Sequence, residues 1–136
     1  NILINQKGLF HRMYKDKPNN FDSFCWHYDV VKTILTNASV LATNEHSLVQ
    51  ALTFKIQNSE IWGVQYHPEF NPYWVSGLMK MRKSALLENK IFFNELDYMK
   101  MQTFFSKLTE NYELKKQLNI SDSINDEKIR YLELIN

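Results

Sequence analysis

The sequence predicts a mixed fold in which β-strands fill the first half of the chain and α-helices the second half. Three observations lead to this prediction. Apolar residues alternate with a period of two before residue 67, they recur with a period of about 3.6 after residue 72, and Pro68 and Pro72 mark the change. The chain has 136 residues, 44% of them hydrophobic, which is enough for one domain with its own core.

The expected strands follow one another at spacings of about ten residues. In the segment FDSFCWHYDVV, residues 21–31, Phe24, Trp26 and Tyr28 share one face. The other expected strands are NILI, ASVLAT, LVQALTF and EIWGVQY, and the turn clusters KDKPNNFD, NEHS and KIQNS separate them. This pattern indicates several strands joined by short, hairpin-like turns.

Helices are expected from Pro72 onward. One apolar stripe predicts an amphipathic helix that ends near Asn89, and Asn94 can cap a second helix. Two further helices are expected over residues 112–118 and 126–134. The phenylalanines of this half are expected in the helix core; they are Phe92, Phe93, Phe104 and Phe105. No linker divides the chain, so we expect one domain over residues 1–136, strand-rich over 1–70 and helical over 71–136.

Composition narrows the classes of function. Sixteen Lys and Arg against fifteen Asp and Glu give no electrostatic reason to expect a nucleic acid or a membrane as partner. No apolar run approaches the roughly 20 residues that cross a bilayer, no signal peptide is evident, and Cys25 is the single cysteine, so a cytoplasmic protein is expected. Only three glycines are present, which suggests that the tight turns of an α/β enzyme lie outside this chain.

A histidine and a glutamate flank Pro68 at the end of the last expected strand. Strand alternation places His67 and Glu69 on the same side, and Pro68 ends the ladder pairing, so the carboxylate can orient the imidazole. A base held in one tautomer by a carboxylate is what activation of a nucleophile needs. By spacing alone, however, a histidine beside a carboxylate is more often a structural hydrogen bond than a catalytic pair.

The surrounding residues resemble one enzyme family. GVQYHPEF resembles the segment of class I glutamine amidotransferases that carries the histidine and glutamate of their Cys-His-Glu triad. WHYDVV is similar to their Ser-His-x-Asp segment, with Trp26 in place of the serine, and HSLVQAL resembles the stretch that lines the glutamine pocket. The similarity is greatest to amidotransferases related to GMP synthase, whose C-terminal extension the helical tail KIRYLELIN also resembles.

The resemblance implies an α/β, flavodoxin-like fold, represented here by its later strands and C-terminal helices. It implies hydrolysis of glutamine to glutamate and ammonia without a cofactor or metal, and transfer of the ammonia to an acceptor on a synthetase domain or subunit. His67 would be the base and Glu69 its support. The substrate-binding residues that it implies are His27, Ser47, Leu48 and Val49.

The nucleophile of that family is missing from the pattern. The family places its cysteine in a Gly-x-Cys-x-Gly turn, whereas Phe24 and Trp26 flank Cys25, which is therefore expected to be a buried structural thiol. The chain begins with Asn1 and is expected to be a C-terminal fragment that is inactive alone. The loss of its N-terminal half would leave central parallel strands with an exposed edge, so a homo-oligomer formed through that edge is expected.

Two other classes of function remain open. The chain could be a non-catalytic binding or assembly module of amidotransferase descent. It could also hold zinc through four side chains with imidazole or carboxylate ligands, namely His27, Asp29, His67 and Glu69. The pattern assigns no role to His11 or His46.

Overall fold

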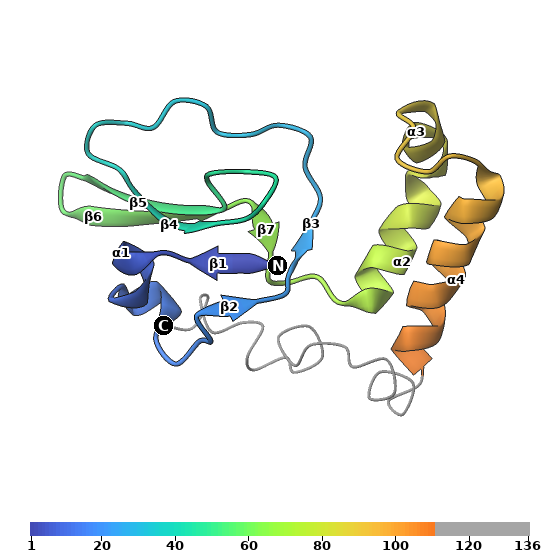
Figure 1. Cartoon of the computed structure of the whole chain (residues 1–136), viewed down its shortest axis with the longest axis horizontal. Coiled ribbons are helices and arrows are strands. Elements are labelled where there is room, and N and C mark those ends of the chain that lie inside the picture. The colour runs from blue at the N-terminus through green and yellow to red at the C-terminus, as the bar shows by residue number, and fades with distance from the viewer. Residues whose placement is uncertain (111–136) are drawn as a thin grey trace. The chain divides into compact units, whose positions relative to one another are not determined.

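The computed structural model describes residues 1–110, so the helices expected over 112–118 and 126–134 lie outside the described residues. This part of the chain separates into two compact units, residues 1–69 and residues 70–110 (Figure 1). All strands of the described residues lie in the first unit, and helices make up most of the described part of the second unit. The change of period near residue 70 thus coincides with the boundary between the units. That all 136 residues form one domain stays a prediction.

A five-stranded sheet is the main element of the first unit (Figure 1). Its strand order is β2-β1-β4-β5-β6, which leaves β2 and β6 at the edges among the described residues. The strands are β1 (Ile2–Ile4), β2 (Asn20–Phe21), β4 (Ser39–Thr43), β5 (Ala51–Ile56) and β6 (Ser59–Val64).

All four strand pairs of this sheet are antiparallel, so the expectation of central parallel strands is wrong for the described residues. Short connections explain why two of these pairs, β4 with β5 and β5 with β6, are antiparallel. Only residues 57 and 58 join β5 to β6, and only residues 44–50 join β4 to β5, whereas a parallel pair needs a crossover of a dozen residues or more. Gln57 takes the left-handed conformation that such a tight turn demands, with a φ of 52°.

A separate two-stranded ribbon pairs β3 (Phe24–Cys25) with β7 (Tyr66–His67), again antiparallel. The strand expected over residues 21–31 is therefore wrong beyond Cys25. A local bond explains its end, because the His27 ring nitrogen Nδ1 lies 2.8 Å from the backbone oxygen of Asp29. Such a bond from a side chain to a nearby backbone group competes with ladder pairing.

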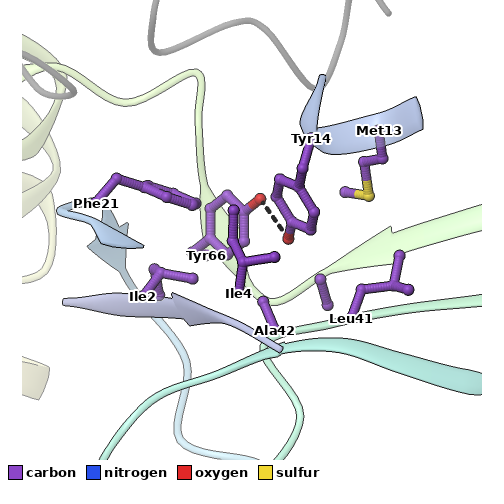
Figure 2. Close-up of a cluster of buried hydrophobic side chains, with 9 residues drawn as sticks. Ile2, Ile4, Met13, Tyr14, Phe21, Leu41, Ala42 and Tyr66 are labelled. Carbon is purple, nitrogen blue, oxygen red and sulfur yellow. Dashed lines mark hydrogen bonds between the residues drawn. The ribbon is translucent and has the colours of Figure 1, made fainter. Parts of the chain in front are cut away.

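The core of this unit is a cluster of apolar side chains from β1, β2, β4, β5 and β7 and from residues 13 and 14 (Figure 2). Tyr66, 1% exposed, packs edge to face against Phe21 and places its hydroxyl 3.1 Å from that of Tyr14. Tyr14 comes from the 3-10 helix η1 (Arg12–Tyr14), which follows the short helix α1 (Gln6–Leu9). The segment that leads to His67 is thus anchored by the residue directly before it.

A polar cluster joins η1 to β6. His11 caps η1 by accepting a hydrogen bond at Nδ1 from the amide of Met13, and its Nε2 lies 3.2 Å from Oε1 of Glu60. The pKa of Glu60 is held below its usual value by its polar neighbours, first the Trp62 side chain and then His11 and Thr53; of these, His11 and Thr53 hydrogen-bond to the carboxylate. The carboxylate therefore ties the turn after β1 to the edge of the sheet.

The second unit contains three helices among its described residues, α2 (Pro72–Met81), α3 (Lys83–Glu88) and α4 (Glu95–Glu110). The expected Asn94 cap is present, because its side chain accepts from the amide of Asp97. Asn71 caps α2 in the same way by accepting from the amide of Trp74. The helix expected to run to Asn89 divides at Arg82, and nothing in the local sequence explains the break. None of these helices, nor any other in residues 1–110, is both long and apolar enough to cross a membrane.

Helices α2 and α4 pack through a mixed interface. Val75, Met79, Tyr98 and Leu108 are buried, and the Tyr98 hydroxyl donates to the backbone oxygen of Met79 at 3.2 Å. The expectation that Phe93 belongs to the core is wrong, because its side chain is 98% exposed. It lies in the turn between α3 and α4, where the helical period that supported the expectation does not apply.

Candidate functional site

The clearest candidate is the pair formed by His67 and Glu69. Strand β7 ends at His67, and Pro68, which has no N–H group for a further ladder bond, turns the chain. The ring nitrogen Nδ1 of His67 then lies 2.6 Å from Oε1 of Glu69. Their side chains are 30% and 51% exposed, so both can be reached from solvent.

The hydrogen bond determines where the ring holds its proton. An ionised carboxylate can only accept, so Nδ1 must be the nitrogen that donates. The lone pair of the neutral ring is then on Nε2, the atom that can take a proton from another group. The geometry therefore gives His67 the tautomer of a general base supported by a carboxylate.

Cys25 lies close to this pair in the ribbon but faces away from it. The register places Phe24 opposite His67 and Cys25 opposite Tyr66. Since successive side chains of a strand point to opposite faces, the Cys25 thiol lies on the face away from the His67 ring.

The expectation that Cys25 is a buried thiol is wrong, because the residue is exposed. Neighbouring atoms nevertheless desolvate the sulfur in part, which raises the pKa of the thiol, and Sγ donates to Oε1 of Gln50 at 3.8 Å. A raised pKa is the opposite of what an activated nucleophile needs.

His27 lies in the irregular segment that follows the ribbon. Its Nδ1 is 2.8 Å from the backbone oxygen of Asp29, and a carbonyl oxygen can only accept. His27 therefore has the same tautomer as His67, with its lone pair on Nε2. The ring is half-buried and the Asp29 side chain is exposed.

Ser47, Leu48 and Val49 lie in the loop between β4 and β5. Asn44 shapes this loop, because its side-chain oxygen accepts from the amide of Ser47 at 2.7 Å. Ser47 and Val49 are 6% and 2% exposed, and the Ser47 hydroxyl bonds to the backbone oxygen of Val49 at 3.0 Å. Leu48 is 82% exposed. Of these three side chains, only that of Leu48 is open to a ligand in this conformation.

Gln65 connects these segments, although the sequence pattern did not single it out. Its side-chain Nε2 donates to the backbone oxygen of Asp29 at 3.2 Å, and its Oε1 lies 3.4 Å from the hydroxyl of Ser47. The structure thus brings His27 and Ser47 together at Gln65, two residues before His67. The alternation that relates residues 65, 67 and 69 was the sequence signal that could have found it.

Gln50 is a second residue that the pattern missed. It is fully buried, and its side-chain nitrogen Nε2 has no hydrogen-bond partner among the described residues. Its side-chain oxygen accepts from Cys25, and its backbone oxygen accepts from the amide of Gln65 at 2.9 Å. Gln50 therefore attaches the ribbon and the Gln65 segment to the start of β5.

The geometry does not support the zinc alternative. Within residues 1–110, no three side chains of His, Cys, Asp or Glu come together as a metal ion would require. At Asp29 the backbone oxygen, rather than the carboxylate, is the group that bonds to His27. His67 and Glu69 bond to each other, which suits acid–base chemistry.

Comparison with known proteins gives one family and two relatives. The model of the family described as glutamine amidotransferase class-I matches residues 1–76. A gamma-glutamyl-L-1-hydroxyisopropylamide hydrolase of a Pseudomonas species is 33% identical over 88 residues, which are 65% of this chain and 30% of that protein. The glutamine-hydrolyzing GMP synthase subunit of Methanococcus vannielii is 40% identical over 57 residues, which are 42% of this chain and 29% of that protein.

No solved structure matches the chain. The aligned region spans about three tenths of the length of each of these two relatives.

Proposed function

The chain belongs to the class I glutamine amidotransferase family, and from this premise we propose that His67 and Glu69 form the basic part of a site that hydrolyses a γ-glutamyl amide. The observation that carries the proposal is the 2.6 Å contact between Nδ1 of His67 and Oε1 of Glu69. It leaves Nε2 as the basic atom and holds the ring in one orientation. A base that activates the nucleophile in the hydrolysis of an amide needs a ring nitrogen that can accept a proton and a fixed ring orientation.

In the proposed reaction Nε2 of His67 takes the proton of a cysteine thiol. The thiolate attacks the side-chain carbonyl carbon of the substrate, and the imidazolium returns the proton to the departing nitrogen. A thioester forms and ammonia or an amine leaves. Nε2 next takes a proton from water, the hydroxide attacks the thioester, and the γ-carboxylate and the thiol are released. Glu69 stabilises the charged ring in both halves of the reaction.

The nucleophile of this reaction is a cysteine outside the 136 residues. Three observations disfavour Cys25 as the attacking group. Its thiol lies on the face of the ribbon away from the His67 ring, the pKa of the thiol is raised, and no glycine flanks the residue. A separate cysteine is compatible with relatives that are more than three times as long as the matched region. The chain by itself is then inactive.

The substrate class follows from what the two relatives share. One is named for hydrolysis of a γ-glutamyl amide with a small organic leaving group, and the other for hydrolysis of glutamine. The acyl part is the same in both cases, and only the departing nitrogen differs. The common chemistry is therefore cleavage of a γ-glutamyl C–N bond, with glutamine as the simplest substrate. Transfer of the ammonia to a synthetase domain or subunit is the accompanying proposal for partners.

The same premise extends to the fold and the assembly. The antiparallel sheet and the three helices are, in this proposal, the later part of a flavodoxin-like α/β fold whose parallel strands come from elsewhere. Strand β6 is an edge of the sheet among the described residues, and such an edge can accept another strand. A second copy at this edge gives the expected homo-oligomer, and light scattering that finds only monomer would argue against it.

A chimera tests the catalytic proposal directly. Residues 1–76 replace the equivalent segment of the Methanococcus protein, which supplies the rest of the enzyme, and glutamate release is measured. The unmodified chimera should hydrolyse glutamine, and His67→Ala should reduce the rate by about 10²- to 10⁴-fold, as expected for loss of a general base. The 136-residue chain alone should release no glutamate.

The matched control is His46→Ala. His46 also lies beside a carboxylate, 3.1 Å from Oε1 of Glu45, but this exposed pair is in a loop and has no proposed role. The control should leave the rate unchanged. A His67→Ala chimera that keeps its activity would overturn the proposal. A chimera that melts cooperatively yet releases no glutamate even with His67 present would favour the non-catalytic assembly module instead.

A further inference from the structure

Gln65 bridges two segments that are far apart in the sequence. One is the turn that contains His27 and Asp29, and the other is the loop that contains Ser47. The bridge consists of one side-chain amide, with its nitrogen 3.2 Å from the backbone oxygen of Asp29 and its oxygen 3.4 Å from the Ser47 hydroxyl. Both segments contain residues that the family resemblance implies for substrate binding, His27 in the first and Ser47 in the second.

The partners determine which way round this amide lies. The Asp29 backbone oxygen can only accept, so it must face the NH₂ group of Gln65. The Ser47 hydroxyl can donate, and it shares its single proton between the backbone oxygen of Val49 and Oε1 of Gln65. Reversal of the amide would bring two acceptors together at Asp29 and lose that bond.

The same backbone oxygen sets the tautomer of His27. A carbonyl oxygen has two lone pairs, so that of Asp29 can accept from Gln65 and from Nδ1 of His27 together. The Gln65 amide thereby holds the Asp29 peptide group in the orientation that His27 requires. Without it, the peptide in this exposed segment can turn, and the His27 ring can redistribute its proton between its two nitrogens.

We propose that Gln65 is a positioning residue that keeps His27 in the Nδ1–H tautomer and ties it to the Ser47 loop. Nε2 of His27 is then an acceptor of fixed orientation. An acceptor of this kind complements the α-ammonium group that every γ-glutamyl substrate carries. This assignment of a ligand group rests on the proposed function, whereas the link between Gln65 and the tautomer does not.

The test uses the complete 136-residue chain with ¹⁵N-labelled histidines. Long-range ¹H–¹⁵N NMR at about pH 8 reports which ring nitrogen carries the proton. A His27→Gln variant assigns the His27 signals. His11 supplies an internal reference of the opposite kind, because its Nδ1 accepts from the amide of Met13 and its proton must be on Nε2.

In the wild-type chain His27 should show one protonated nitrogen, Nδ1. Gln65→Leu keeps the volume but removes both polar groups, and Gln65→Glu keeps an acceptor for Ser47 but removes the donor to Asp29. Both changes should convert the His27 signals to an average of the two tautomers. Gln6→Leu makes the same substitution at an exposed position of α1 and should leave the spectrum as in wild type.

Two outcomes overturn the inference: protonation of Nε2 on His27 in the wild-type chain, or an unchanged Nδ1–H signal in both Gln65 variants. The wild-type spectrum decides the first point even if a variant fails to fold. His67 is read in the same spectrum, and its proton should stay on Nδ1 in every variant because its partner is Glu69. A His67 ring protonated on Nε2 would contradict the proposed function and leave the inference about Gln65 standing.

Discussion

Phe24 lies opposite His67 in the ribbon of β3 and β7, which places the neighbouring Cys25 opposite Tyr66. Cys25, the only cysteine of the chain, is thus next to the residue that pairs with His67. His67 in turn bonds to Glu69. The described residues combine an imidazole held by a carboxylate with a thiol on the opposite face of the ribbon.

The reactivity of Cys25 follows from this arrangement. Because partial burial raises the pKa of its thiol, labelling by a thiol reagent at pH 8 should be slower in the folded chain than in the chain unfolded in urea. The pH dependence of labelling should give an apparent pKa above the ordinary value of 9.0. Faster labelling of the folded chain, or loss of glutamate release in a Cys25→Ser chimera, would mean that Cys25 is an activated nucleophile.

Replacement of Glu69 tests the support of the base separately from the base itself. Glu69→Gln can present either an N–H group or an oxygen to Nδ1 of His67, so it no longer fixes the tautomer. Glutamate release by the chimera should fall by about 10²-fold, less than for His67→Ala. Glu45→Gln, which changes the carboxylate beside His46, is the control and should have no effect. Equal rates for Glu69→Gln and the parent chimera would show that Glu69 has no catalytic part.

Two glycines should respond oppositely to the same substitution. A Cβ atom on Gly8 would lie 2.2 Å from the backbone oxygen of Leu41 and 2.6 Å from a side-chain carbon of Ile4, so Gly8→Ala should destabilise the fold by about 3 kcal/mol. A Cβ atom on Gly77, within α2, would meet nothing within 4 Å, so Gly77→Ala should stabilise it by about 0.5–1 kcal/mol. Urea unfolding measures both, and a neutral Gly8→Ala change would contradict the close packing of α1 on β4.

Glu60 should make the stability of the first unit depend on pH. Its pKa in the folded chain lies below the ordinary value of 4.5, because the neighbouring side chains of Trp62, His11 and Thr53 favour the charged form. This contribution is present above about pH 4.5 and is lost as the pH falls through the lowered pKa. The difference in urea midpoint between wild type and Glu60→Gln should therefore shrink as the pH falls from 6 to 3. Glu88→Gln, a substitution at an exposed residue, is the control. A difference that grows toward low pH would contradict a lowered pKa for Glu60.

Much of the local structure could be read from the sequence. The alternation in ASVLAT and EIWGVQY predicted β4 and β6, and the Asn94 cap predicted the beginning of α4. The contact between His67 and Glu69 was also foreseeable, because two residues on one side of a strand end depend only on local geometry. The class I amidotransferase motif was equally local, and the family match over residues 1–76 confirms it.

Other features depend on contacts between residues that are distant in the sequence, and these became evident only in the folded chain. Alternation could not show that Cys25 is exposed or that it lies opposite Tyr66, because its partner strand is about forty positions away in the sequence. The link from Ser47 through Gln65 to Asp29 is of the same kind. The contact between His67 and Glu69 was set locally, since only Pro68 separates the two residues in the chain. Only the folded chain determined which side chains surround that pair, since strand register places residues that no local pattern relates.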